Sequence, residues 1–213
     1  MNYCEELHKI LEQGKRFDFK SGFADLPASG IYILYQKGEI GHGKDRIVRI
    51  GTHVGDGNLK QRIISHFEKE NKNRSIFRKN IGRAMLNKDK NPYLKIWNYD
   101  TTAKSAREKY AGEVDKNFER QLEKKISKYI QDNFYFKVLE VQNKADRLRL
   151  EARLIGTVSN CKICCASKGW LGNFSPEPKI KASGLWLVNE LYKDELSKEE
   201  LEEIKRRLIY VRS

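Results

Sequence analysis

Five residues are the candidates for a catalytic site: Tyr32, Arg49, Arg62, His66 and Glu151. A phenol, an imidazole and a carboxylate can transfer protons, and a carboxylate can also hold a metal ion. Arginine stays protonated, so it can bind an anion but cannot act as a base. Together the five side chains suit a reaction on an anionic substrate.

Glu151 is the most informative of the five because of its surroundings. Residues 144 to 158 predict a helix with one broad apolar arc, and Glu151 falls inside that arc. A carboxylate on an apolar face is costly unless it is paired or binds a metal. A salt bridge to an arginine such as Arg62 and a metal site are both open, and we favour the metal site.

Arg62 and His66 are four residues apart in a helix predicted over Leu59–Glu70. They lie along one edge of its buried stripe, where a side chain can reach a neighbouring sheet and still meet solvent. Alone, the pair would be a surface arginine and a partly buried histidine. With Tyr32 and Arg49 upstream, we interpret the pair as part of an active site.

Two short strands, Gly30–Tyr35 and Arg46–Gly51, should position Tyr32 and Arg49, because both are rich in β-branched and aromatic residues. Alternation puts Ile31, Ile33 and Tyr35 on one face of the first strand, and Val48 and Ile50 on one face of the second. If these faces pack together, Tyr32 and Arg49 share the opposite face. We interpret residues 37–45, with three glycines, as a mobile turn between the strands.

Other segments predict further elements of an α/β (α+β) fold. They are a helix over 3–13, a helix or helix pair over 106–132, a third strand over 134–141, the helix over 144–158, and a terminal helix. The terminal helix begins at the capping box formed by Ser197 and Glu200.

The composition points to a polyanionic partner. The chain has 213 residues, with 42 Lys plus Arg against 29 Asp plus Glu, for a net charge of +13. Such an excess favours nucleic acid, although a merely soluble basic protein is the alternative. The length indicates one domain with elaborations, or one domain and a small second one.

Residues 71–95 hold eight basic residues and one acid, over half of the net excess. Part of this run has a helical rhythm from which Arg74, Arg78 and Lys79 are expected to project. Phosphate contacts there would supply salt-sensitive affinity without base specificity, to DNA or equally to RNA. The candidate nucleic-acid-binding residues are Lys72, Arg74, Arg78, Lys79, Arg83 and Asn173.

Membrane insertion and secretion are not indicated. No apolar run reaches the roughly 20 residues that span a bilayer, and the N-terminus lacks a signal-peptide pattern. We therefore expect a cytoplasmic protein, nucleoid-associated if the source is prokaryotic, with no membrane partner. Its four cysteines are expected to be reduced thiols.

Cys161, Cys164 and Cys165 suggest part of a zinc knuckle. A structural zinc ion needs four ligands, and no second cysteine pair or histidine lies near them in the sequence. Cys4 is the only other cysteine. We expect small buried thiols here rather than a metal site.

The ordered motifs resemble those of the GIY-YIG nuclease superfamily, which includes homing, restriction and repair endonucleases. The resemblance rests on Gly30-Ile31-Tyr32, on Ile50-Gly51, on Arg62 with His66, and on Glu151 followed by Leu154-Ile155. The chain departs from the family in having Arg49 where a second tyrosine is usual. The resemblance implies a small three-stranded antiparallel sheet flanked by helices, and hydrolysis of DNA phosphodiesters with one metal ion.

It also implies roles for the five residues. Glu151 would anchor Mg²⁺ (or Mn²⁺), Tyr32 would activate the attacking water, and Arg62 would neutralise the phosphate in the transition state. Arg49 would either stabilise the phenolate or grip a phosphate oxygen, and His66 would orient groups or relay a proton. An asparagine downstream of the metal ligand is common in the family, and both Asn160 and Asn173 are candidates.

The expected organisation is a single nuclease domain over 1–213. Its catalytic core covers about 28–70 and 134–190, with a basic and helical elaboration over about 71–133. We expect a stand-alone restriction-type or defence endonuclease acting on duplex DNA. The alternatives are a structure-specific repair or mobile-element nuclease, an RNA-directed nuclease, and a non-catalytic DNA- or RNA-binding protein. Cutting both strands with one site per chain would favour a homodimer.

Overall fold

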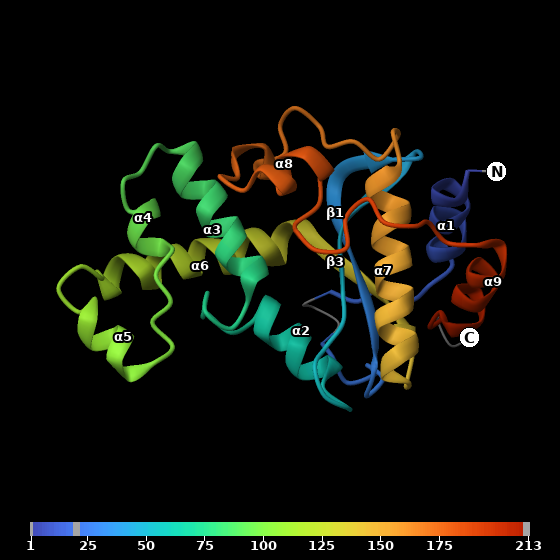
Figure 1. Cartoon of the computed structure of the whole chain (residues 1–213), viewed down its shortest axis with the longest axis horizontal. Helices are drawn as coiled ribbons and strands as arrows, with labels where there is room; N and C mark the ends of the chain where they lie inside the picture. The colour runs from blue at the N-terminus through green and yellow to red at the C-terminus, as the bar shows by residue number, and fades with distance from the viewer. Residues whose placement is uncertain (1, 19–21, 211–213) are drawn as a thin grey trace.

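A three-stranded antiparallel sheet forms the centre of the computed structural model, which describes residues 2–18 and 22–210 (Figure 1). The strands are β1 (Gly30–Gly41), β2 (Lys44–Gly51) and β3 (Phe134–Glu140), in the order β2-β1-β3. β2 and β3 are therefore the outer strands, and both pair with β1. The prediction of an α+β fold with this sheet is confirmed.

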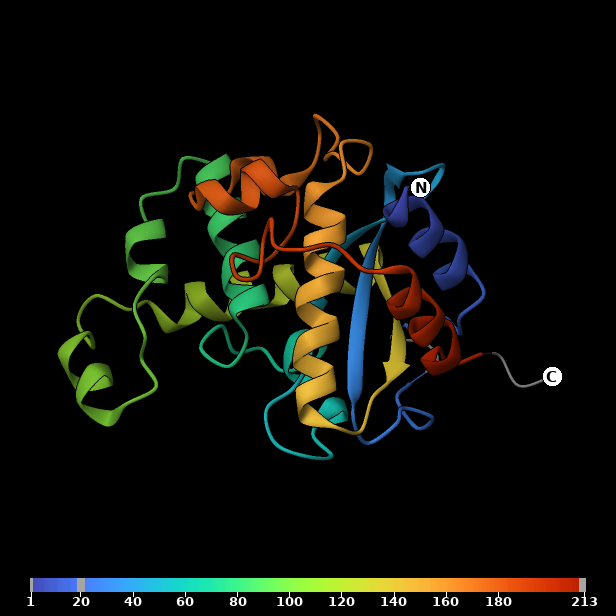
Figure 2. The same ribbon diagram turned by 45° about the vertical axis from the view of Figure 1, so that its right-hand side comes forward.

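Helices cover both faces of the sheet, as Figure 2 shows. Hydrophobic residues of α1 (Tyr3–Glu12), α7 (Lys144–Asn160) and α9 (Lys198–Arg207) pack on one face. Those of α2 (Leu59–Phe67), α3 (Ile76–Lys88) and α6 (Lys116–Asn133) pack on the other. The shorter helices are α4 (Leu94–Trp97), α5 (Lys104–Lys109), η1 (Leu171–Phe174) and α8 (Pro178–Ser183). Within the described ranges, no helix is long and apolar enough to cross a membrane.

The connection between β1 and β2 is shorter than predicted. Residues 37–45 are mostly strand, and only His42 and Gly43 form the turn, both with positive φ (52° and 73°). Two left-handed residues make the tight hairpin turn that matches the twist of the strands. The interpretation of this stretch as a mobile loop is wrong, because the strands pair almost to its tip.

A β-bulge in β2 changes the predicted faces. Leu34 pairs with Arg49 and Tyr35 pairs with Ile47, so Val48 is the extra residue. Val48 consequently packs with Tyr32 and Leu34, whereas Ile50 packs on the opposite face of the sheet. The prediction that Val48 and Ile50 share a face is wrong, since simple alternation does not allow for a bulge. Tyr32 and Arg49 nevertheless meet, because the Arg49 side chain reaches the Tyr32 hydroxyl.

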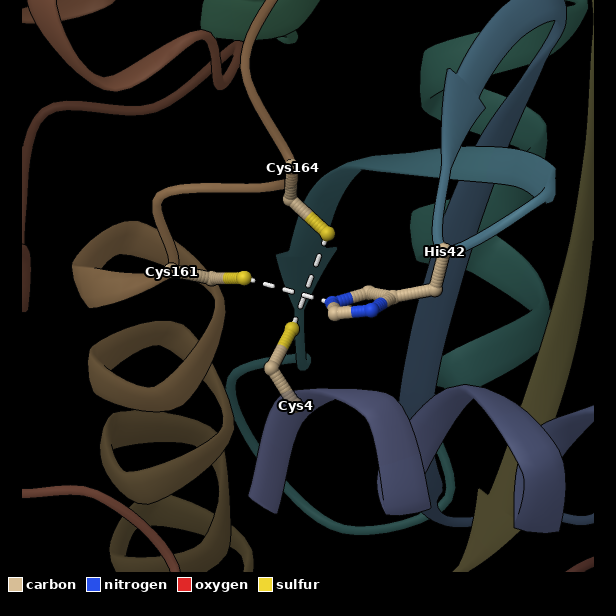
Figure 3. Close-up of side chains that lie close together, drawn as sticks. All are labelled: Cys4, His42, Cys161 and Cys164. Carbon is tan, nitrogen blue, oxygen red and sulfur yellow. Dashed lines mark hydrogen bonds between the residues drawn. The ribbon is translucent and has the colours of Figure 1, made fainter. Parts of the chain in front are cut away.

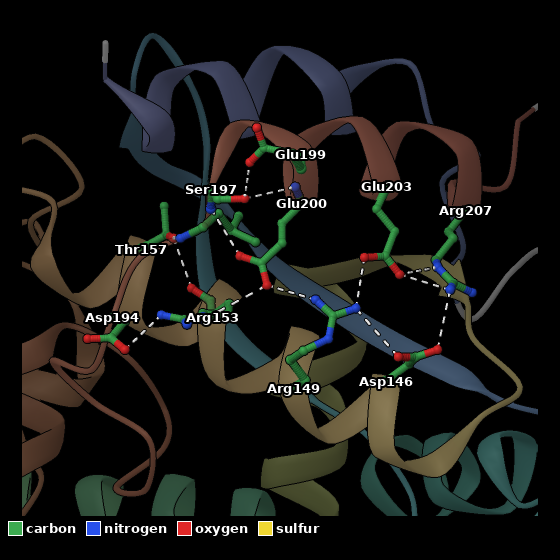
Figure 4. Close-up of polar contacts among 11 residues, drawn as sticks. Asp146, Arg149, Arg153, Thr157, Asp194, Ser197, Glu199, Glu200, Glu203 and Arg207 are labelled. Atoms are coloured by element: carbon green, nitrogen blue, oxygen red, sulfur yellow. Dashed lines mark hydrogen bonds and ion pairs between the residues drawn. The ribbon is translucent and has the colours of Figure 1, made fainter.

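Ion pairs hold the outer side of α7 against α9 (Figure 4). Arg149 contacts Glu200 (2.7 Å) and Glu203 (2.8 Å), and the predicted capping box of Ser197 and Glu200 begins α9. Residues two apart point about 200° from each other around a helix. With Arg149 turned towards α9, Glu151 is therefore turned the other way, towards β2.

Candidate active site

The hydroxyl of Tyr32 joins a base and a cation beneath the protein surface. Its oxygen lies 2.9 Å from Nε2 of His66 in α2, and Nε of Arg49 in β2 donates to it at 3.2 Å. A second nitrogen of Arg49 donates to the carbonyl of Trp186, which fixes the guanidinium. A Cβ at Gly51 would overlap the Tyr32 hydroxyl, so this glycine allows the phenol to cross to its partners.

His66 is fully buried and held at both ring nitrogens. Its Nδ1 lies 2.6 Å from the hydroxyl of Ser75, which caps α3 by accepting a hydrogen bond from the Arg78 backbone. Burial holds the pKa of His66 well below its usual value, and the charges of Arg49, Arg62 and Arg78 lower it further. A neutral imidazole with its proton on Nδ1, donated to Ser75, leaves Nε2 free to accept the Tyr32 proton.

A pocket of about 500 Å³ opens beside this cluster and contains the other predicted residues. Arg49, Arg62 and Glu151 all line it, from β2, α2 and α7 respectively. The five residues singled out in the sequence therefore come together around one place, with Tyr32 and His66 behind Arg49. The fold achieves this because α7 lies over the outer strand β2 and α2 lies on the other face of the sheet (Figure 1).

Glu151 and Arg62 share this pocket without an ion pair. Among residues 2–18 and 22–210, neither side chain has an acid–base partner within 4 Å, and Nε of Arg62 is buried without a hydrogen bond. The salt-bridge interpretation of Glu151 is therefore not supported. Burial raises the pKa of Glu151, and Glu190 raises it too, while Arg49 and Arg62 act in the opposite direction.

The lining includes polar residues that the sequence did not single out: Asn80 of α3, and the adjacent pair Asn189 and Glu190. This pair follows the apolar segment Leu185–Val188, in which the Trp186 amide donates to the carbonyl of Val48 and so pairs with β2. Glu190 has a positive φ of 61° and accepts a hydrogen bond from Lys193. The local sequence gives one weak indication of Asn189 and Glu190, because these two polar residues come directly after a short apolar run.

The donor set of the pocket fits a hard cation. Glu151, Asn189 and Glu190 supply carboxylate and amide oxygens, which Mg²⁺ prefers, and no cysteine or histidine belongs to the lining. A cation between Glu151 and Glu190 would also relieve their mutual repulsion, which contributes to the raised pKa of Glu151. Mg²⁺ or Mn²⁺ with several waters suits this environment.

The two asparagines considered from sequence lie elsewhere. The amide of Asn160 donates to the carbonyl of Lys193 (3.0 Å), and that of Asn173 donates to the carbonyls of Ser167 (2.8 Å) and Lys168 (3.1 Å). Neither residue lines the pocket. Asn173 therefore braces its own loop, and the asparagines that line the pocket are Asn80 of α3 and Asn189.

The predicted nucleic-acid contacts need correction at two residues. Arg78 does not project from α3: it is fully buried and pairs with Glu123 of α6 at 2.7 Å. Lys72 is also buried, where it pairs with Glu119. Both basic residues neutralise acids of the long helical segment that follows them, which a count of local charge cannot reveal.

The remaining basic candidates differ in exposure. Lys79 and Arg83 are half-buried and donate to Asn98. Arg74 is exposed and lines a second cleft, of about 460 Å³, between the α2–α3 loop and α6. This cleft contains further exposed cations that the sequence did not single out: Arg107, Lys116 and Arg120.

Comparison with known proteins adds one finding. A family model described as "GIY-YIG domain" matches residues 2–211, almost the whole chain. No curated protein and no solved structure matches the chain.

Proposed function

The chain belongs to the GIY-YIG nuclease superfamily, and from this premise we propose that it is a metal-dependent endonuclease that hydrolyses DNA phosphodiester bonds. The observation that carries the proposal is the hydrogen-bonded cluster of Tyr32, His66 and Arg49 beside a pocket containing Arg62 and Glu151. A protein that only binds nucleic acid would not need a buried chain of proton-transferring groups beside a carboxylate that can hold a metal ion. The cluster therefore favours catalysis over binding alone.

Tyr32 is proposed as the residue that takes the proton from the attacking water. Its own proton passes transiently to Nε2 of neutral His66, 2.9 Å away, and Ser75 holds the imidazole in the accepting tautomer. Because burial and the nearby arginines disfavour the protonated imidazole, His66 must release this proton again as the reaction proceeds. Arg49 donates to the phenol oxygen and so stabilises the negative charge that develops there. Of the two roles expected for Arg49, stabilising the phenolate is the one that its Nε already serves, with Nη1 held by Trp186. Arg49 also lines the pocket, so its third nitrogen, Nη2, leaves the phosphate contact open.

Arg62 is proposed to bind the substrate phosphate, and Glu151 is proposed to bind the metal ion. The unsatisfied Nε of Arg62 can donate to a phosphate oxygen, which would compensate its burial. Glu151, with Asn189 and Glu190, would hold Mg²⁺ or Mn²⁺. When bound, this ion stabilises charge on the scissile phosphate and the leaving oxygen.

A restriction-type or defence role is proposed for the whole enzyme, with duplex DNA as its substrate. The segment from 71 to 133 supplies exposed cations directly after α2, the helix that carries Arg62. Such an elaboration can grip DNA next to the cutting site. A repair or mobile-element nuclease is the alternative that the experiment below distinguishes.

The test is cleavage of supercoiled plasmid with Mg²⁺ or with EDTA, comparing the wild type with Glu151→Ala. Discrete linear fragments that need both the metal and Glu151 are the expected result. Nicking or smearing with the same requirements would retain the nuclease and replace the restriction role. Equal cutting by Glu151→Ala, or by the wild type in EDTA, would overturn the assignment of the metal ligand. Parallel assays on single-stranded DNA and RNA test the choice of duplex DNA.

A further inference from the structure

Far from the pocket, four side chains that can ligate a metal converge on one point. They are Cys4 of α1, His42 at the hairpin turn, Cys161 at the end of α7, and Cys164 in the loop that follows (Figure 3). Their sulfur and nitrogen atoms all lie within 4.8 Å of one another. The sequence shows no complete ligand set near Cys161, because two of the ligands, Cys4 and His42, are more than a hundred residues away.

The spacing of these atoms matches a tetrahedral ion. Zinc bonds of about 2.3 Å to sulfur and about 2.0 Å to nitrogen place neighbouring ligand atoms about 3.5 to 3.8 Å apart. The sulfurs of Cys4 and Cys164 are 3.6 Å apart, and Nε2 of His42 is 3.2 Å from the sulfur of Cys161. The other four pairs lie within 4.8 Å, so a tetrahedral site needs expansion of the second contact and contraction of any pair near that limit.

The backbone is shaped to bring the ligands together. His42 occupies a left-handed turn position with φ of 52°, a conformation in which asparagine, aspartate and histidine are enriched among residues other than glycine. This conformation directs its ring towards the cysteines, as Figure 3 shows. A Cβ at the preceding Gly41 would lie 2.9 Å from the Cys164 sulfur, so glycine is needed for that sulfur to approach the hairpin.

We propose that Cys4, His42, Cys161 and Cys164 bind one Zn²⁺ ion in a closed structural site. Three thiolates and one imidazole form a ligand set typical of structural zinc, with no position left for a substrate. Binding displaces the three thiol protons to solvent and leaves a net charge of −1 on the site. The expectation of unliganded buried thiols is thereby replaced.

Two neighbouring groups suit the outer shell of such a site. His8 is buried and its Nε2 lies 3.4 Å from the Cys164 sulfur, where an N–H can donate to a thiolate. Arg46 lies near enough for its positive charge to interact with Cys164. Both can offset the negative charge of three thiolates with one divalent ion.

The ion would tie together three parts of the fold. It would link the N-terminal helix to the β1–β2 hairpin and to the end of α7, all on one side of the sheet (Figure 2). Cys161 is ten residues beyond Glu151, which corresponds to about 15 Å along the helix. The zinc ion therefore acts on stability and on the placement of α7, and it does not take part in hydrolysis.

The test is metal analysis of untagged protein purified under reducing conditions. We expect about one zinc per chain, measured by elemental analysis and as a mass gain in native mass spectrometry. Metal-free, reduced protein should also take up Co²⁺ and develop the visible absorption of tetrahedral thiolate coordination. Cys161→Ser and His42→Asn should lose the zinc, and the asparagine variant keeps a residue that tolerates the left-handed turn.

Cys165→Ser is the matched control. Cys165 is adjacent to Cys164 but exposed, and its sulfur donates to the Lys162 carbonyl. This variant should keep its full zinc content, and His8→Phe should weaken zinc binding about tenfold or more. A strong chelator should lower the melting temperature of the wild type and of Cys165→Ser, while leaving that of Cys161→Ser unchanged.

Several results would overturn the proposal. One is wild-type protein that contains no zinc and takes up no Co²⁺ when reduced. Another is zinc retained equally in Cys161→Ser and His42→Asn, which would place the metal elsewhere. A third is a Cys4–Cys164 disulfide in protein purified with reductant, since it would consume two of the ligands. None of these readouts depends on nuclease activity.

Discussion

At the scale of single residues, the phenol of Tyr32 connects the groups for which we propose proton transfer. It contacts His66 and Arg49 in the interior, and it is reached only because Gly51 has no side chain. Arg49 replaces the tyrosine usual at its position in the family. It supplies a permanent positive charge next to the oxygen that must become negative.

Tyr32→Phe tests this arrangement. We expect loss of cleavage with the fold retained, because the ring still fills the core while the oxygen that His66 and Arg49 share is gone. Leaving two buried partners unpaired should cost about 1 to 3 kcal/mol of stability. Single-turnover cleavage and urea unfolding measure the two effects. Cleavage at the wild-type rate would eliminate Tyr32 as the residue that activates water.

His66 should make stability depend on pH. Its folded-state pKa lies well below the usual value, so below about pH 6.5 the unfolded chain binds a proton that the folded chain excludes. The contribution of neutral His66 to stability should be fully present above that pH. The free energy of unfolding should decrease as the pH drops below it, by up to about 1.4 kcal/mol per pH unit. Urea unfolding at about pH 7.5 and about pH 5.5 measures this slope.

His66→Gln should show a shallower decline over the same range. The pKa of His53 is also lowered, mainly by burial, but His53 is present in both proteins and cancels in the comparison. Equal slopes for the wild type and the variant would contradict a neutral, buried His66.

At the scale of elements, a buried ion pair links α3 to α6 and supports the site from behind. Arg78 donates to Glu123 and Ser127 of α6, and also to the backbone carbonyl of His66 at the end of α2. Burial raises the pKa of Glu123, whereas Arg78 lowers it, so the acid depends on its partner to stay ionised. Three helices therefore meet at one guanidinium.

Arg78→Leu should destabilise the protein by about 3 to 5 kcal/mol, because it leaves the Glu123 carboxylate buried without a partner. The double variant Arg78→Leu/Glu123→Leu should recover much of this loss. Arg74→Leu, at an exposed position just before α3, should change stability by less than about 0.5 kcal/mol. Chemical unfolding of the four proteins measures these differences. An Arg78→Leu protein as stable as Arg74→Leu would show that the pair is not structural.

At the scale of the whole molecule, the net charge is +13. The positions of the exposed positive charges on the protein differ from those that the runs of basic residues in the sequence suggest. Lys72 and Arg78 are buried and paired with Glu119 and Glu123, whereas Arg74, Arg107, Lys116 and Arg120 are exposed. These four exposed cations line the cleft together with Lys72 and with Glu70, Glu119 and Glu123. The cleft brings together cations from the α2–α3 loop, α5 and α6. It is the surface on which we expect the DNA backbone to lie.

The triple variant Arg107→Ala/Lys116→Ala/Arg120→Ala should bind duplex DNA more weakly and with less salt dependence. Each lost phosphate contact reduces the slope of log affinity against log salt by about 0.9. Fluorescence anisotropy in EDTA over a range of salt concentrations measures the slope without cleavage. Lys198→Ala, at the exposed start of α9 and outside the cleft, is the control. An unchanged slope in the triple variant would place DNA on another surface.

The sequence by itself determined the main helices and strands around the sheet and the five residues at the candidate site, but it did not predict α4, η1, α8 or the length of the β1–β2 hairpin. Periodicity of apolar residues is a local property, so it located the strands, the helix of Arg62 and His66, and the helix on which Glu151 interrupts an apolar face. The resemblance placed those residues in one family, to which the chain belongs.

Only the tertiary structure decided which polar groups meet. A one-residue bulge moved Val48 to the other face of the sheet, and distant acids pair with Lys72 and Arg78 in the interior. Asn80 and Asn189, rather than Asn173, line the pocket. Cys4 and His42 joined Cys161 in the same way. These are contacts between segments far apart in the chain, set by strand register and helix packing, and residue spacing along a sequence carries no record of them.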